Sequence, residues 1–423
     1  MEQLKEKAII MGVHLANRPD FAYAMEELSN LAEACHIELA GELTQKVTRI
    51  VPSTYIGKGK IQELSELIEE KGASLVISND ELTPSQIRNL ESSLDCKVID
   101  RTVLILEIFA ERAQTRESQL QVEIAQLQYM LPRLVGLRTS LGRQGGGSGM
   151  INRGSGETKR ELDRRRIEER ITALQAELEM LVTRRQTQRK QRRKNEVPVV
   201  CLVGYTNAGK SSLMNAILQQ YNRGTTKQVL AKDMLFATLE TSVRNINLPD
   251  RKSFLLTDTV GFVSQLPHHL VKAFRSTLEE VAEADLLIHV VDLSSPEYTK
   301  QMEVTKHTLK ELGASEIPVI IAYNKADLTE YPYPQIEGDS VYLSAREHRG
   351  IDEMAQVIRD QVFQQYVHCE MIIPYDQSRL VAYFNEHAHV TETSYEEDGT
   401  RLKMECRASD LEQYRELLHQ ANL

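Results

Sequence analysis

The chain has 423 residues, of which 41% are apolar and 26% are charged, a size that predicts about three domains with packed cores. No apolar run approaches the roughly 20 residues of a membrane span, and Met1–Lys7 lacks the apolar segment of a secretory signal. The five cysteines include no CxxC pair, which argues against a zinc site and a disulfide framework. We therefore expect a cytoplasmic protein.

The net charge of −10 conceals an asymmetry along the chain. Residues 124–194 contain 17 Lys and Arg against 7 Asp and Glu, so this stretch carries +10 and the rest carries −20. An acidic protein with one basic segment is typical of a polyanion-binding protein. A solvated charged helix explains a single basic run equally well.

Strand-like and helical patterns alternate over residues 1–105, which predicts a small N-terminal α/β domain with a mainly parallel sheet. Strands are expected over Ala8–Val13, Ile37–Thr48, Ser74–Ser78 and Lys97–Asp100, and helices over Phe21–Ala34, Ile61–Lys71 and Thr83–Leu94.

Residues 106–195 carry long helical periods on either side of a glycine-rich break. Apolar residues recur every three or four positions over 106–134, and again in a second helix expected to start near Thr158. The break at 141–157 is too long for a tight turn. We expect an antiparallel helical hairpin with a flexible basic tip, followed by a basic linker over Arg184–Lys194.

From Val197 the pattern becomes that of a P-loop nucleotide-binding α/β domain, which we assign to residues 196–366. Its strands are expected over Val197–Val203, Ser253–Thr257, Leu286–Val291, Val319–Tyr323 and Val341–Leu343. Residues 367–423 predict a small α+β domain with a hairpin turn at Asp398-Gly399.

The segment from Gly204 to Ser211 fits the phosphate-binding pattern G-x-x-x-x-G-K-[ST] between a strand and a helix. Glycines let backbone N–H groups turn toward phosphate oxygens. Lys210 would supply a cation to the β- and γ-phosphates, and Ser211 a hydroxyl ligand to Mg²⁺. We assign nucleotide binding to Gly204, Tyr205, Thr206, Asn207, Ala208, Gly209, Lys210, Ser211 and Ser212.

Three further motifs follow at the ends of apolar strands, where open α/β sheets bind ligands. In Asp258-Thr259-Val260-Gly261, the aspartate would reach Mg²⁺ through water and the glycine N–H would meet the γ-phosphate. In Asn324-Lys325-Ala326-Asp327, the carboxylate of Asp327 can accept hydrogen bonds from N1–H and N2–H₂ of guanine, while the Lys325 stem covers the base. A backbone N–H of Ser344-Ala345 would meet guanine O6. Because adenine lacks that donor pair, the four motifs together predict GTP.

Thr238 lies between the P-loop and Asp258, and we expect it to be the switch I ligand of Mg²⁺, with Thr225 and Thr226 as weaker alternatives. Lys210, Thr238 and Gly261 are the residues expected to act in catalysis.

Phe262 stands where Ras-like GTPases place a water-orienting Gln. A Phe cannot hydrogen-bond water. Hydrolysis should therefore be slow, use another group such as Gln265, His268 or Arg275, or depend on a partner.

Several segments resemble the HflX family of GTPases, and the resemblance covers about residues 8–366. It is carried by Tyr55-Ile56-Gly57-Lys58-Gly59-Lys60, by Gly142-Arg143-Gln144-Gly145-Gly146-Gly147 and by the run from Gly261 to Glu280. It implies a Ras-like GTPase domain behind an α/β domain and a helical hairpin. It also implies a protein that binds the large ribosomal subunit, with its hairpin tip near the rRNA of the peptidyl-transferase region. A monomer suits a factor that docks on one site. Members are thought to dissociate stalled or idle ribosomes, GTP favouring the bound form.

Basic residues in two places suit rRNA phosphates. Arg138, Arg143 and Arg153 flank the glycine-rich tip, and Lys58 and Lys60 stand at a helix start, where N–H groups also favour phosphate. A plain turn before a helix explains the lysines equally well.

Asn207 suggests a second cation, because a P-loop Asn at this place holds K⁺ beside the phosphates in several related GTPases. The alternative is an Asn favoured by the geometry of the turn.

Two other functions stay open: a signalling or regulatory GTPase with a protein partner, and an RNA remodeller that uses ATP as well as GTP. The basic hairpin disfavours the first, and the lack of a complete second P-loop in the N-terminal region disfavours the second.

Overall fold

The computed structural model describes residues 6–16, 20–133, 153–194, 197–222, 236, 241–250, 252–264, 280–412 and 414, with the backbone alone over 153–160 and 185–194. The chain forms two compact units. The first comprises Met1–Gln191, Lys232–Glu240 and Val260–Glu279, and the second comprises Arg192–Ala231, Thr241–Thr259 and Glu280–Leu423.

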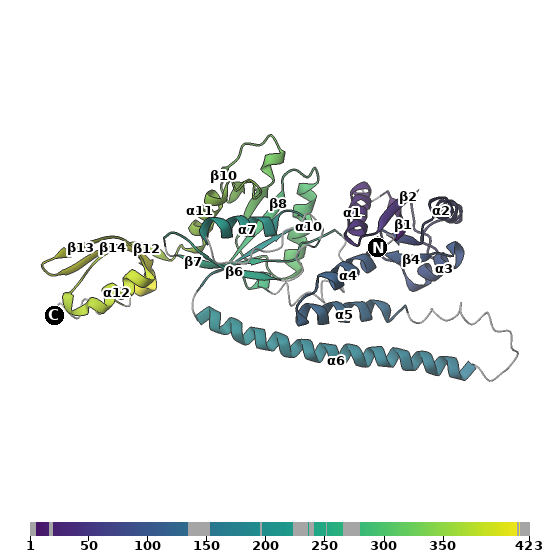
Figure 1. Cartoon of the computed structure of the whole chain (residues 1–423), viewed down its shortest axis with the longest axis horizontal. Helices are drawn as coiled ribbons and strands as arrows, with labels where there is room; N and C mark the ends of the chain where they lie inside the picture. The colour runs from purple at the N-terminus through teal and green to yellow at the C-terminus, as the bar shows by residue number, and fades with distance from the viewer. Residues whose placement is uncertain are drawn as a thin grey trace, which may run out of the picture. The chain divides into compact units, whose positions relative to one another are not determined.

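The N-terminal residues form a four-stranded parallel sheet in the order β2-β1-β3-β4 (Figure 1). Its strands are β1 (Lys7–Leu15), β2 (Glu38–Val47), β3 (Leu75–Ser78) and β4 (Lys97–Asp100). Alternate residues of β1 face opposite cores. Ala8 and Ile10 pack with helices α1 (Phe21–Ala34) and α4 (Arg101–Arg112), and Ile9 and Met11 pack with α2 (Lys58–Lys71) and α3 (Pro84–Leu94). Burial on both faces explains the continuous apolar run of β1.

Three helices of this layer begin and end at residues close to those expected: α1 (Phe21–Ala34), α2 (Lys58–Lys71) and α3 (Pro84–Leu94). A capping box between Thr83 and Gln86 and Pro84 at the first position start α3. Gly72 ends α2 with a left-handed φ of 61°.

The helical period over 106–134 belongs to two helices, not to one as expected. They are α4 (Arg101–Arg112) and α5 (Arg116–Met130). Ala113 has an extended backbone, and the Thr115 side chain accepts a hydrogen bond from Ser118 N–H, which caps the second helix. An apolar period does not reveal such a break, because both helices keep the same buried stripe.

A single 42-residue helix, α6 (Arg153–Lys194), follows. It starts five positions before Thr158, and it includes the segment Arg184–Lys194 that we expected to be a linker. That segment has no Gly or Pro, and its Arg, Lys and Gln residues favour helix. α5 and α6 run antiparallel, because Arg116 binds Glu177 while Arg170 binds Glu123. Their shared core is Leu120, Ile124, Ile171 and Leu174.

The nucleotide-binding region is a seven-stranded sheet in the order β10-β11-β9-β8-β5-β7-β6 (Figure 1). Its strands are β5 (Val199–Gly204), β6 (Ser242–Asn247), β7 (Ser253–Asp258), β8 (Leu286–Asp292), β9 (Val319–Asn324), β10 (Gln335–Glu337) and β11 (Ser340–Tyr342). The sequence patterns missed β6 and β10, which pair antiparallel at the two edges. Both are short, and Ile246 is the one buried residue of β6.

Helices α7 (Lys210–Tyr221) and α11 (Ile351–Val362) pack into the core of this sheet, and α10 (Tyr298–Glu311) contacts β5 and β8. A 3-10 helix, η2 (Ala326–Leu328), follows β9.

The C-terminal residues form an antiparallel sheet in the order β12-β14-β13, against which a helix packs together with Leu411 and Tyr414. The elements are β12 (Tyr366–Ile373), the 3-10 helix η3 (Tyr375–Gln377), α12 (Ser378–His387), β13 (His389–Glu396) and β14 (Gly399–Arg407). The hairpin turn is Glu397-Asp398, one position before the expected Asp398-Gly399, because Glu396 pairs with Gly399 at the start of β14. Within the described residues of the whole chain, no helix is both long and apolar enough to span a bilayer.

Candidate nucleotide-binding site

The P-loop has a backbone conformation at two positions that residues other than glycine rarely adopt. Gly204 ends β5 with a φ of 145°, and a Cβ there would lie 2.2 Å from the carbonyl oxygen of Val290. Gly209 precedes α7 with a φ of 91°, and its Cβ would lie 2.2 Å from Nδ2 of Asn324. Both glycines are therefore needed for the close approach of neighbouring groups.

Lys210 is buried at the first position of α7. Its Nζ donates to the carbonyl oxygens of Gly204 at 3.2 Å and Tyr205 at 2.9 Å, so the ammonium lies inside its own loop. Burial lowers the pKa of Lys210 to about 8, and the nearby Asp258 carboxylate opposes this shift. The loop thus holds a cation whose charge costs free energy until an anion approaches.

Ser211, the second residue of α7, meets Asp258 at the end of β7. The Ser211 hydroxyl donates to Oδ2 of Asp258 at 2.6 Å, and the carboxylate is fully buried. A hydroxyl and a carboxylate oxygen are the hard ligands that Mg²⁺ prefers, so these residues fit the ion that the P-loop fold implies. In the described residues no group of three or more His, Cys, Asp or Glu could hold a metal. Nucleotide phosphates would supply further ligands.

Asn324 joins two of the predicted motifs. Its Nδ2 donates to the Ala208 carbonyl of the P-loop at 2.9 Å, and its Oδ1 accepts from the Ala345 N–H at 3.0 Å. The side chain is buried, with 2% exposed. Asn324 thus ties the phosphate loop to the loop after β11.

The base-recognition motif continues into η2. Lys325 has a left-handed backbone, and its Nζ donates to Oδ2 of Asp292 at 2.7 Å. Oδ1 of Asp327 is buried and has no hydrogen-bond partner within the described residues, which suits a carboxylate whose partner is a guanine edge. Sequence reasoning missed Asp292, although its place at the end of β8, on the same sheet edge, could have revealed it.

The other predicted nucleotide-binding residues have various surroundings. Tyr205 and Thr206 are buried, Ser212 is half-buried, and Asn207 is exposed with a φ of 61°. The Ser344 N–H donates to the Arg349 carbonyl at 3.0 Å. Together with the Asn324–Ala345 bond, this engages both N–H groups that we had considered for guanine O6.

The switch residues are described in part. Thr238, Thr225, Thr226, Gln265, His268 and Arg275 lie outside the described residues. Gly261 and Phe262 are buried, Phe262 with 2% exposed.

The candidate RNA-binding residues are also described only in part. Lys58 begins α2 and is exposed. Lys60 binds Glu63 at 2.8 Å, and the Gly57 N–H donates to Gln45 Oε1 at 2.9 Å. These two bonds satisfy groups that we had considered for phosphate. Arg153 is the first residue of α6, and Arg138 and Arg143 lie outside the described residues.

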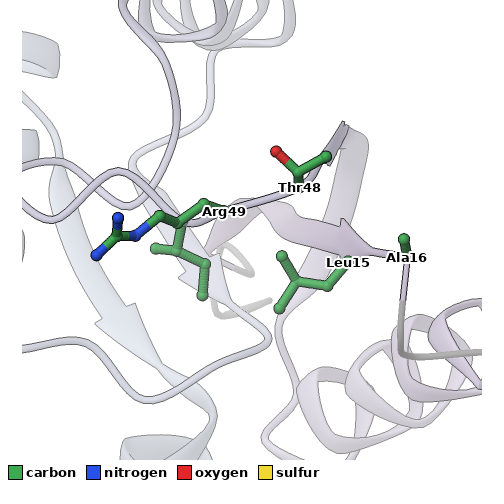
Figure 2. Close-up of a pocket in the computed structure, with 5 residues that line it drawn as sticks. Leu15, Ala16, Thr48 and Arg49 are labelled. Carbon is green, nitrogen blue, oxygen red and sulfur yellow. The ribbon is translucent and has the colours of Figure 1, made fainter.

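A pocket of about 460 Å³ opens at the carboxyl ends of β1 and β2 (Figure 2). It is lined by Leu15, Ala16, Thr48, Arg49 and Ile50. The sequence did not single it out. A second nucleotide site in this region would need phosphate-binding groups, and of the five lining residues Arg49 alone carries a charge.

Three family models match consecutive parts of the chain: GTP-binding GTPase N-terminal over residues 22–110, GTP-binding GTPase Middle Region over 112–192, and 50S ribosome-binding GTPase over 199–325. GTPase HflX of Caldanaerobacter subterraneus subsp. tengcongensis is 45% identical over 99% of this chain and 96% of the relative. GTPase HflX of Escherichia coli (strain K12) is 38% identical over 93% of this chain and 92% of the relative. A solved GTP-binding protein from Sulfolobus solfataricus in complex with GDP has 23% identity and a TM-score of 0.43, covering 85% of this chain and 99% of that one.

The chain shares 38–45% identity with these relatives over nearly its full length, and it carries the P-loop, the Ser211–Asp258 pair and the Asn324–Asp327 motif described above. The chain is a GTP hydrolase and belongs to the HflX family of GTPases.

Proposed function

We propose that this protein binds the large ribosomal subunit from the cytoplasm and dissociates stalled or idle ribosomes, and that GTP hydrolysis resets it. Membership of the HflX family and the match of residues 199–325 to a 50S ribosome-binding GTPase model support the proposal. The observation that carries it is the α5–α6 hairpin, a long antiparallel arm with a large excess of basic residues.

The positive charge of the arm is not spread evenly. Arg164 and Arg165 bind Glu168 and Glu169 one turn further along α6, and Arg170 binds Glu123 of α5. These pairs fit the alternative of a solvated charged helix. The last eleven residues of α6, 184–194, have seven Lys or Arg and no acid in the sequence, so net positive charge is concentrated in this part of the helix, which favours an rRNA-binding surface.

Sedimentation with purified ribosomal subunits tests the proposal. We expect the protein to pellet with the large subunit in the presence of a non-hydrolysable GTP analogue, and less with GDP. We also expect it to convert intact ribosomes into subunits in sucrose gradients. If it pelleted with neither subunit in any nucleotide state, the ribosomal function would be wrong, and a regulatory GTPase with a protein partner would take its place.

The proposed RNA contacts Lys58, Lys60, Arg138, Arg143 and Arg153 can be tested one by one. Replacing a phosphate-contacting residue by Ala should weaken large-subunit binding and reduce the slope of log affinity against log salt by about 1. Arg164→Ala and Arg165→Ala provide matched controls on the same arm, because both side chains are bonded to glutamates. Equal losses in the controls would contradict these contacts.

Guanine recognition by Asp327 has a direct test. Asp327→Asn replaces the carboxylate by an amide that cannot accept from both N1–H and N2–H₂. We expect GTP binding to weaken strongly and xanthosine triphosphate binding to appear, both measured by calorimetry. Unaltered GTP binding would refute the assignment. Lys210→Ala should abolish nucleotide binding or turnover.

A K⁺ ion held by Asn207 is a finer proposal. We expect GTP hydrolysis to be faster in K⁺ than in Na⁺. The left-handed backbone of Asn207 gives a separate, conformational reason for this residue. Asn207→Gly separates the two reasons, because Gly keeps the backbone and removes the amide. A K⁺ response that survives in Asn207→Gly would exclude the ion-binding role.

A further inference from the structure

The segment 260–263, which follows Asp258 and Thr259, is buried in the first unit. Part of it packs into the N-terminal layer, which is the β2-β1-β3-β4 sheet with its helices. Val260 and Val263 belong to the same hydrophobic cluster as Phe109 of α4. Phe236 joins this cluster too, with its ring edge-on to Phe109 at a centroid distance of 4.7 Å. The segment expected to respond to the γ-phosphate is therefore packed against the α1–α4 side of the N-terminal sheet.

A buried ion pair lies at the end of this segment. Glu27 of α1 and Arg101 of α4 each have 3% of the side chain exposed, and they bind each other. Arg101 is the first residue of α4, directly after β4, and its Nη1 donates to Asn79 Oδ1 at 3.2 Å. A buried pair with a further neutral partner is retained where it fixes a conformation more than where it adds stability.

The pair engages every polar group of Ser264. Arg101 Nη2 donates to the Ser264 carbonyl oxygen at 3.1 Å, the Ser264 N–H donates to Glu27 Oε1 at 3.4 Å, and the Ser264 hydroxyl donates to Glu27 Oε2. Two residues far away in sequence thus hold both backbone groups of one switch residue. These hydrogen bonds fix the direction of the Ser264 peptide groups, which the burial of Val260 and Val263 alone would not do because apolar burial is non-directional.

We propose that Glu27 and Arg101 are positioning residues of the GTPase: through Ser264 they hold the peptide of Gly261 ready for the γ-phosphate. The proposal rests on the expected contact between the Gly261 N–H and that phosphate. Gly261 lies three residues before Ser264, with buried Phe262 and Val263 between them. GDP lacks the γ-phosphate, so loss of the Ser264 bonds should weaken GTP binding and hydrolysis and leave GDP binding unchanged.

Two variants test this. Ser264→Ala removes the hydroxyl and keeps the Glu27–Arg101 pair. Arg101→Lys keeps the charge and removes the planar guanidinium, whose Nη2 donates to both Glu27 and the Ser264 carbonyl. For each, dissociation constants of GDP and of a non-hydrolysable GTP analogue are measured without ribosomes, together with kcat and Tm. We expect the preference for the analogue over GDP to fall about 3- to 10-fold, the effect of a hydrogen bond or two, and kcat to fall as well.

Arg133→Lys is the matched control. Arg133 also donates to backbone carbonyls, those of Tyr129 and Leu82, and in the described residues no bond joins it to 260–264. It should lower Tm and leave the nucleotide preference unchanged. The proposal is overturned if Ser264→Ala keeps the wild-type preference and kcat, or if Arg133→Lys changes them as much. Ribosome sedimentation is a separate measurement, so failure here and failure of the ribosomal function are distinguishable.

Discussion

Nucleotide binding should take up a proton at Lys210. Burial lowers the pKa of this side chain to about 8, and the β- and γ-phosphates would restore it toward its ordinary value by placing negative charge beside the ammonium. Below pH 8 the lysine is already charged, so binding takes up little. From a pKa of about 8, the expected uptake is about 0.1 proton at pH 7, about 0.5 at pH 8 and about 0.9 at pH 9. Affinity should correspondingly fall as pH rises above 8.

Isothermal titration calorimetry measures this uptake as the dependence of the binding enthalpy on the ionisation enthalpy of the buffer. Phosphate groups titrate at about pH 6, so at pH 8 and above the nucleotide itself contributes little to the proton uptake. Lys210→Arg is the matched control, because a guanidinium stays charged at every pH used; any binding it retains should show no uptake. The titration is run at pH 8 and at pH 9, each in two buffers of different ionisation enthalpy. If the binding enthalpy of the wild type were the same in the two buffers at both pH values, Lys210 would be charged before binding, and burial would not lower its pKa as stated.

Three further outcomes are expected. Asn324→Ala leaves the Ala208 carbonyl and the Ala345 N–H without their partner, so it should cost about 2–4 kcal/mol of unfolding free energy and weaken GDP and GTP alike; a loss confined to GTP would contradict this. Tyr129→Phe removes a 2.6 Å hydrogen bond to the buried Asp100 and should cost about 1–3 kcal/mol in urea unfolding, with nucleotide affinity unchanged. Phe262→Gln should not accelerate hydrolysis, because the site of Phe262 is buried and an unpartnered amide there costs about 1–3 kcal/mol of unfolding free energy. Phe262→Leu is the control for loss of the ring, and faster turnover of Phe262→Gln at an unchanged Tm would refute this expectation.

Local patterns predicted most of the N-terminal layer. Phe21–Ala34 and Lys97–Asp100 have the expected bounds, because an amphipathic helix and a short buried strand are specified by neighbouring residues. The break between α4 and α5 was missed, since the apolar stripe continues across it. The helical end of α6 was missed for the opposite reason. It has no apolar stripe, so the helix propensity of its residues is the one local signal for a helix there.

At the candidate site, the sequence predicted which residues meet but not all of their bonds. Ser211 and Asp258 lie in contact because the start of α7 and the end of β7 stand at the same carboxyl edge of the sheet, while their expected roles toward Mg²⁺ stay predictions. The Asn324 bridge and the Lys325–Asp292 bond depend on side-chain directions that spacing does not supply. The Glu27–Arg101–Ser264 cluster lay beyond sequence reasoning altogether. Ser264 is 237 positions from Glu27, and each residue alone looks like an ordinary helix or turn residue.

The residues expected to bind nucleotide are held by different contacts in each unit. In the second unit, Asn324 ties the P-loop to the loop of Ala345, and these groups would serve GDP and GTP equally. The segment after Thr259 belongs to the first unit, where Glu27 and Arg101 hold Ser264. Only a γ-phosphate would make use of that segment. Through the expected contact of the Gly261 N–H with the γ-phosphate, the preference for GTP over GDP would depend on a backbone group whose position the N-terminal layer sets. Substitutions in α1 and α4 should therefore be judged first by nucleotide preference, and only then by their effect on ribosome binding.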